Sequence, residues 1–199
     1  MTEPPRRPVR PLLAADVERL ARDAGGGDPF ARLELAHATA AVVVEAGRGE
    51  HGGPTAQFVR LVDEVGLDTL SELWRDAPAD SLPGALWALY LLQTWCGRQG
   101  EAVARAYRAG VAFAPVDEVV AGVAADADPA AVRQLSDAVL TGAYEGDFDV
   151  ALERAAAFFR VVATGREQIG EDVELAARNL DTAQALRRAA ACWRAGTLR

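Results

Sequence analysis

Few residues of this chain have the types and the spacing that bind a metal ion. Glu34 and His37 are three positions apart in a helix-forming stretch, so both side chains would lie on one helical face. Di-iron helical bundles need two such Glu/His pairs and two further Glu, whereas the other histidine, His51, has no Glu three residues before it. The sequence therefore disfavours a di-iron centre. It leaves two alternatives: a single-metal site of Glu34, His37 and His51, or a half-buried His37 with a structural role.

Signals for other catalytic chemistry are missing from the sequence. There is no Gly-x-Ser-x-Gly motif around a nucleophilic serine. Because the chain contains no lysine, it has no phosphate-binding Gly-Lys-Ser/Thr loop. The two cysteines, Cys96 and Cys192, lie in apolar stretches, where we expect buried, unreactive thiols rather than a disulfide. We therefore expect no bound cofactor and favour a protein that is not an enzyme.

Two tryptophans offer a different kind of site. Trp87 and Trp95 are eight residues apart, which on a helix places them near one face, about 12 Å apart along the axis. Tyr90 lies between them in the sequence. Indole rings fill protein cores and also line pockets and interfaces. Two interpretations stay open: core packing, or a pocket for a small apolar ligand near Trp87, Tyr90 and Trp95.

These aromatic residues belong to the most apolar stretch of the chain, residues 82–96, which we expect to be a central, buried helix. Ser81 is a typical N-cap residue, Pro83 suits a first helical turn, and Gly97 predicts the end. Apolar side chains point in almost every direction around this helix, which predicts burial on all sides. The apolar core is only about half of the roughly 20 residues that span a bilayer, so a membrane helix is excluded.

The composition predicts an all-α fold. Ala, Leu, Arg and Glu are strong helix formers, whereas threonine and aromatic residues are sparse and Ile169 is the only isoleucine. Start and stop signals predict about ten helices, at residues 12–24, 30–46, 55–65, 68–77, 82–96, 101–109, 117–125, 129–144, from Asp147 or Asp149 to Gly165, and 171–194. We expect one domain over residues 12–199, either a helical bundle or an irregular array of helical hairpins. Residues 1–11 form a Pro/Arg-rich stretch that we expect to be a flexible tail.

The charge distribution bears on possible partners. The net charge of -8 disfavours binding to nucleic acid or to an anionic membrane surface. The first residues lack the apolar segment of a secretory signal, so we expect a cytoplasmic protein. Residues 178–199 carry five arginines against one acidic residue, Asp181. Three interpretations stay open: a helix face in solvent, contacts within the chain, or an interface with another protein or a second copy of the chain. The residues we expect at such an interface are Arg187, Arg188, Trp193 and Arg194.

Two resemblances concern the helices. Residues 144–152, YEGDFDVAL, resemble the turn between the two helices of a tetratricopeptide repeat, in which Gly ends the first helix, the aromatic residue packs in the pair and Ala allows close approach. The second-best match, at Gly100, is 46 residues before Gly146, unlike the roughly 34-residue period of such arrays. The resemblance implies an antiparallel hairpin around residues 135–163. The stretches VDEVGLDTLSELW and SLPGALWALYLLQTW are also similar to uncharacterised all-helical proteins of high-GC (actinobacterial-type) bacteria, a resemblance that implies no activity.

Taken together, the residues favour a non-enzymatic helical protein that interacts with another protein or with itself, or that regulates a partner. The alternative is a small-molecule binding or sensing domain with an aromatic pocket near Trp87 and Trp95. A metal-dependent enzyme is the third hypothesis.

Overall fold

The computed structural model describes residues 29–47, 72–145 and 147–199, and within these ranges it contains helices and no strand. The helices are α2 (Pro29–Gly47), α5 (Leu82–Val111), α6 (Pro115–Ala121), α7 (Pro129–Glu145), α8 (Phe148–Gln168) and α9 (Val173–Arg194). Residues 72–74 are helical as well. The prediction of an all-α fold is confirmed. The expected tail 1–11, the expected helices 12–24 and 55–65, and residues 68–71 of the expected helix 68–77 lie outside the described residues. The described part of that last helix ends at Trp74, since residues 75–77 are not helical.

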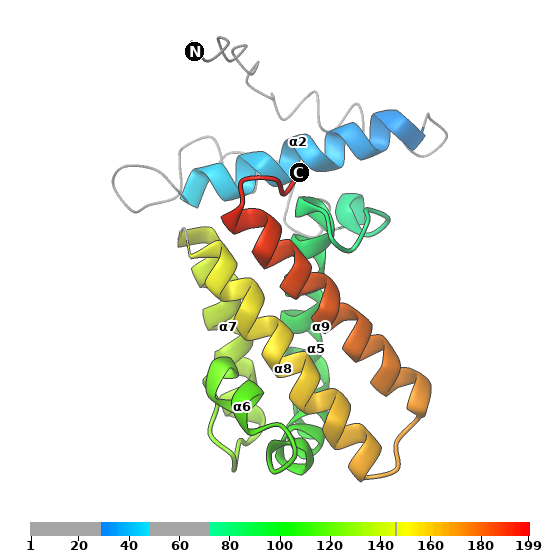
Figure 1. Cartoon of the computed structure of the whole chain (residues 1–199), viewed down its shortest axis with the longest axis vertical. Helices are drawn as coiled ribbons and strands as arrows, with labels where there is room; N and C mark the ends of the chain where they lie inside the picture. The colour runs from blue at the N-terminus through cyan, green and yellow to red at the C-terminus, as the bar shows by residue number, and fades with distance from the viewer. Residues whose placement is uncertain (1–28, 48–71, 146) are drawn as a thin grey trace.

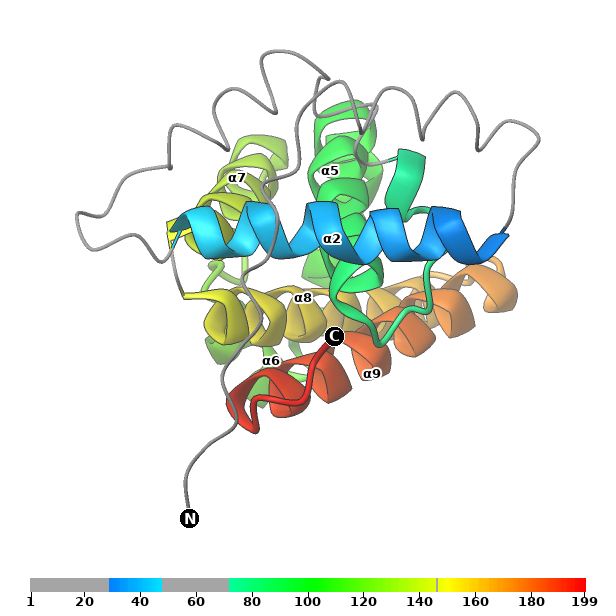
Figure 2. The same ribbon diagram turned by 90° about the horizontal axis from the view of Figure 1, so that it is seen from above.

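The long helices form two layers under a crossing helix. α8 and α9 run antiparallel in one layer, α5 and α7 form the other, and α2 lies across one end of the four (Figures 1 and 2). α8 packs against α5, α6, α7 and α9, while α2 packs against α5 and α7. Residues after α9 return to the start of α5, where the amide of Leu82 donates to the carbonyl oxygen of Arg199 at 2.8 Å. In the part of the chain that is described, no helix has the length and apolar character needed to cross a membrane.

The expected helices 82–96 and 101–109 are one helix. α5 continues through Gly97 and changes direction at Gln99, whose φ of -128° and ψ of 31° are not helical. Gly97 does not adopt the left-handed conformation that would end a helix. Gly100, directly after Gln99, packs against the first residue of α7, since a Cβ on Gly100 would lie 3.2 Å from the Cβ of Pro129. Packing against α7 thus favours a kink where the sequence predicts an end.

Burial of α5 on all sides is not confirmed. One face of the helix is buried, including Leu86, Leu89 and Leu92, but Trp87 and Trp95 are only half-buried and Leu91 is 43% exposed. Buried residues make up 14 of the 30 residues in α5 and 13 of the 21 residues in α8. α8 is therefore the more deeply buried helix, and α5 has a flank that faces a groove.

Several predicted helix starts agree with the structure. The Oγ of Ser81 accepts from the amide of Gly84 at 3.3 Å, and the Oδ1 of Asp128 accepts from the amide of Ala131 at 2.7 Å. Asp147 precedes α8 but makes no side-chain capping bond. α6 begins at Pro115, before the expected start at Asp117, and α8 continues past Gly165 to Gln168.

The predicted hairpin around residues 135–163 corresponds to α7 and α8, which are consecutive and pack on each other. Phe148, the aromatic residue of the tetratricopeptide-like turn, packs edge-on against Trp193 of α9 with ring centroids 4.8 Å apart. This ring contact joins the start of α8 to α9.

Candidate functional site

A partly open groove of about 720 Å³ lies between α5 and α9. Its apolar lining comes from α5, α8, α9 and the turn before α5, as follows: Ala77, Ala79, Trp87, Ala88, Leu91, Trp95, Phe159, Ala185 and Leu186. Small-molecule sites typically have volumes of about 300–1,000 Å³ and a mostly apolar lining with a few polar groups. This groove has both properties.

The α5 wall of the groove follows from the spacing of its residues. Gly84, Trp87, Leu91 and Trp95 recur at steps of three and four, so they form one stripe along the helix. At one end of the stripe the turn before α5 lies directly on the helix, because a Cβ on Gly84 would overlap the carbonyl oxygen of Pro78. The turn therefore borders that end of the groove, where Ala77 and Ala79 also line it.

Trp95 is held on three sides. Its ring stacks on Phe159 of α8 with centroids 6.0 Å apart and planes 9° from parallel. The guanidinium carbon of Arg166 lies 5.2 Å from the Trp95 ring centroid, a cation–π distance. The indole N–H donates to Oε1 of Gln99 at 3.3 Å. An aromatic wall fixed in this way loses little conformational entropy when a ligand binds.

The structure brings two of the three predicted aromatic ligand residues to the groove. Trp87 and Trp95 line it, whereas Tyr90 is not among the lining residues. Tyr90 stacks on Trp87, with ring centroids 5.8 Å apart and planes at 24°, and so supports that ring from the side.

The second wall, from α9, was not predicted. It carries the polar rim of the groove, which consists of Arg178, Asn179, Asp181, Thr182, Gln184 and Arg188. The side-chain hydroxyl of Thr182 donates to the carbonyl oxygen of Arg178 at 2.9 Å. The only sequence signal for this wall is a polar stripe on α9, which is also typical of a helix face in solvent.

Glu34 and His37, the predicted metal ligands, both line a second cavity of about 630 Å³, with Leu82 and Trp193 opposite. His37 is half-buried and Glu34 is exposed. His51 lies outside the described residues. Among the residues that are described, no group of three His, Cys, Asp or Glu side chains could hold a metal ion. The single-metal site therefore lacks a described third ligand.

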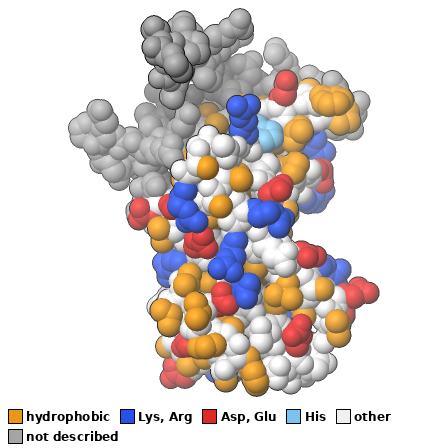
Figure 3. Space-filling model, viewed as in Figure 1, with side chains coloured by type: hydrophobic (Ala, Val, Ile, Leu, Met, Phe, Trp, Pro, Cys, Tyr) orange, Lys and Arg blue, Asp and Glu red, His pale blue; other side chains and the backbone are white. Residues whose placement is uncertain are grey.

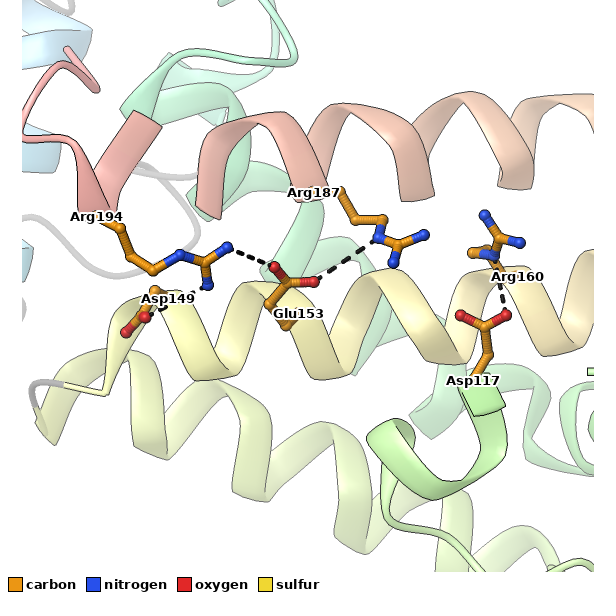
Figure 4. Close-up of polar contacts among 6 residues, drawn as sticks. All are labelled: Asp117, Asp149, Glu153, Arg160, Arg187 and Arg194. Atoms are coloured by element: carbon orange, nitrogen blue, oxygen red, sulfur yellow. Dashed lines mark hydrogen bonds and ion pairs between the residues drawn. The ribbon is translucent and has the colours of Figure 1, made fainter. Parts of the chain in front are cut away.

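The predicted interface residues contact partners inside the chain. Arg194 donates to Glu153 at 2.9 Å and lies 3.6 Å from Asp149, and Arg187 lies 3.8 Å from Glu153 (Figure 4). The hydrogen bond with Glu153 raises the pKa of Arg194 above its ordinary value. These pairs join α9 to α8 in a surface of mixed charge (Figure 3).

The other two predicted interface residues also have intramolecular contacts. Arg188 lies 3.8 Å from Asp80. Trp193 is half-buried against Phe148. All four residues thus contribute to the packing of α9, and an interface formed by them stays a prediction.

Cys96 is buried, as predicted, and Cys192 is half-buried; both are free thiols. Burial raises the pKa of Cys96 to about 12, against the hydrogen bond with Ser136, which lowers it. The thiol is therefore protonated at neutral pH and is a poor nucleophile.

Comparison with known proteins adds no functional assignment: no protein-family model, no curated protein and no solved structure matches this chain.

Proposed function

We propose that the chain is a small-molecule binding protein and that its ligand binds in the groove between α5 and α9. The observation that carries this proposal is the state of Trp87 and Trp95: both rings are half-buried and both line the groove. A ligand that covers them removes aromatic and aliphatic surface from water, which contributes roughly 25 cal/mol per Å² of apolar area.

The lining favours binding over catalysis. It offers aromatic and aliphatic contacts, guanidinium groups and side-chain amides, which orient a ligand. The ligand body we propose is flat or extended and apolar, since the α5 stripe from Trp87 to Trp95 is about 12 Å long.

Binding of a neutral fluorescent probe tests the proposal. We expect N-phenyl-1-naphthylamine to bind saturably, with brighter probe emission and energy transfer from tryptophan. Leu91→Gln should weaken binding about tenfold or more, because Leu91 lines the groove and is 43% exposed, so the change places an amide in the apolar wall without disturbing the core. Val150→Gln is the matched control, since Val150 is 52% exposed on α8 and is not a lining residue.

Two outcomes would contradict the proposal. One is that neither this probe, nor indole, nor 1-decanol binds saturably to the intact chain. The other is that Leu91→Gln and Val150→Gln bind the probe equally well.

A second candidate function, self-association, is favoured by the surface of α6. Phe113, Val116 and Val119 are 62%, 74% and 78% exposed, and hydrophobic side chains gather over this helix in Figure 3. The adjacent Asp117 pairs with Arg160 at 3.0 Å (Figure 4), which offsets its charge beside this surface. A contiguous exposed apolar patch is typical of an interaction site.

Light scattering after size-exclusion chromatography tests self-association. We expect a dimer that Val119→Asp dissociates, whereas Val150→Asp leaves it intact. A chain that stays monomeric at high micromolar concentration contradicts this second candidate.

A further inference from the structure

We infer that the ligand of the groove between α5 and α9 is an apolar molecule that carries a carboxylate, and that Arg178 binds this carboxylate. The inference rests on the proposed function and adds to it the chemical class of the ligand. It follows from the charges that line the groove and from which of them are already neutralised.

The charge around the groove is opposite in sign to that of the whole chain. The charged lining residues are three arginines, Arg75, Arg178 and Arg188, and one carboxylate, Asp181. The chain as a whole has a net charge of -8. Because acidic residues outside the lining can offset this excess, the attraction for an anionic ligand depends on which arginine lacks such a partner.

Two of the three arginines have acidic partners in the chain. Arg75 lies 2.9 Å from Glu72, and Arg188 lies 3.8 Å from Asp80. The guanidinium of Arg178 has neither an ion pair nor a hydrogen bond with any residue that the structure describes. Arg178 is therefore the lining cation with its full hydrogen-bonding capacity available to a ligand.

The guanidinium of Arg178 lies at one end of the groove. Arg188 contacts Asp80 in the turn before α5, which marks the end near Gly84. Arg178 is ten residues earlier on α9, about 15 Å away along the helix. Since α9 and α5 both line the groove over this length, a ligand can cover Trp87 and Trp95 with its apolar body and present its polar end to Arg178.

The chemistry of the guanidinium favours a carboxylate. Arginine binds carboxylates through two parallel N–H···O bonds, and such charge-assisted bonds are stronger than neutral ones. Asn179 and Thr182 flank Arg178 on the rim and add neutral hydrogen-bonding groups. An apolar carboxylate, such as a medium-chain acyl or two-ring aromatic acid, matches both parts of the groove.

A matched pair of probes tests the inference, namely decanoate and 1-decanol, which share an apolar chain and differ in charge. Each is titrated by competition against N-phenyl-1-naphthylamine at low salt. We expect decanoate to bind about tenfold more tightly than 1-decanol. In Arg178→Gln this preference should disappear while the affinity for 1-decanol stays the same. Arg133→Gln, on the exposed surface of α7 outside the groove lining, is the matched control and should keep the preference.

The outcomes separate this inference from the proposed function. If decanoate and 1-decanol displace the probe equally well, the inference that the ligand carries a carboxylate is overturned, and the groove remains a binding site. If decanoate is preferred but Arg178→Gln keeps the preference, the assignment to Arg178 is overturned. If neither the probe, nor indole, nor 1-decanol binds, the proposed function has failed and the inference fails with it.

Discussion

Gly110 of α5 and Gly165 of α8 face each other where the two helices cross, and their backbones are in contact. A Cβ on Gly110 would overlap the carbonyl oxygen of Val161 and lie 2.8 Å from the amide nitrogen of Gly165. A Cβ on Gly165 would overlap the carbonyl oxygen of Ala106. The atoms in the way are backbone atoms, which cannot move aside as a flexible side chain does. The crossing of α5 and α8 therefore requires glycine at both positions.

We predict that Gly110→Ala lowers the free energy of unfolding by about 3 kcal/mol, at the upper end of the usual cost of overpacking. Gly97→Ala is the matched control, because Gly97 lies on the same helix and a Cβ there would meet nothing within 4 Å. Since alanine forms helices better than glycine, Gly97→Ala should stabilise the protein by about 0.5–1 kcal/mol. Urea denaturation followed by circular dichroism measures both changes. Equal stabilities of the two variants would show that the helices do not touch at Gly110.

These glycines also show which parts of the fold the sequence could predict. Asp128 followed by Pro129 marks a helix start, and the structure has one there, because an N-cap depends only on neighbouring residues. Gly97 and Gly165 each predict a break, but both lie inside helices, whereas Gly110 lies one residue before the end of α5. Whether a glycine ends a helix or allows a second helix to approach depends on a distant segment, and no local pattern carries that information.

The same distinction applies to the candidate site. The spacing of Trp87 and Trp95 predicts their common face, since it depends on one helix alone. The α9 wall could not be predicted, because the polar stripe that includes Arg178 is equally suited to solvent. Likewise, Arg194 is indistinguishable in sequence from a free surface arginine until packing places Glu153 opposite it.

A buried hydrogen bond joins α2 to the segment before α5 and leads to a second prediction. The indole N–H of Trp74 donates to the hydroxyl oxygen of Thr39 at 3.0 Å, and both side chains are buried. Thr39→Val leaves the N–H without an acceptor, so we expect a loss of about 1–3 kcal/mol in the free energy of unfolding. The double variant Thr39→Val with Trp74→Phe should lose less than the sum of the two single variants, because it removes both polar groups. Additive losses would contradict a direct bond between these residues.

Two glutamates that each pair with two arginines should differ in their effect on stability. Glu171 lies 3.3 Å from Arg166, whose side chain is only 8% exposed, whereas Glu153 pairs with Arg194, which is 51% exposed. The Nε of Arg166 has no hydrogen-bond partner within the described structure, so loss of Glu171 leaves a nearly buried cation poorly compensated. We predict that Glu171→Gln costs about 2 kcal/mol of unfolding free energy and Glu153→Gln less than about 1 kcal/mol.

Salt concentration separates the two cases. In about 1 M NaCl the effect of Glu153→Gln should vanish, because exposed pairs are screened, while that of Glu171→Gln should persist. Equal salt sensitivity of the two variants would contradict the difference in burial.

Alkaline pH should destabilise the protein through two buried acids, Cys96 and Tyr107. Burial raises the pKa of the Cys96 thiol from 9.0 to about 12 and that of the Tyr107 phenol from 10.0 to about 12. The phenol also donates a hydrogen bond to the carbonyl oxygen of Val123 at 3.1 Å, which only the protonated form can make. Between the unfolded and folded pKa values the unfolded state has lost the proton and the folded state has kept it.

Because the folded state binds more protons in this window, the free energy of unfolding falls as pH rises. The stabilisation is complete below about pH 9 and is lost by about pH 12, with a slope of up to about 1.4 kcal/mol per pH unit for each group. Urea titrations at pH 7, 9, 10 and 11 measure the slope. Cys96→Ala should remove the part that begins near pH 9 and Tyr107→Phe the part that begins near pH 10, while below pH 8 both variants should keep the slope of the parent protein. If the slope above pH 9 is unchanged in the variant with both substitutions, other groups cause the alkaline loss and burial of these two acids does not.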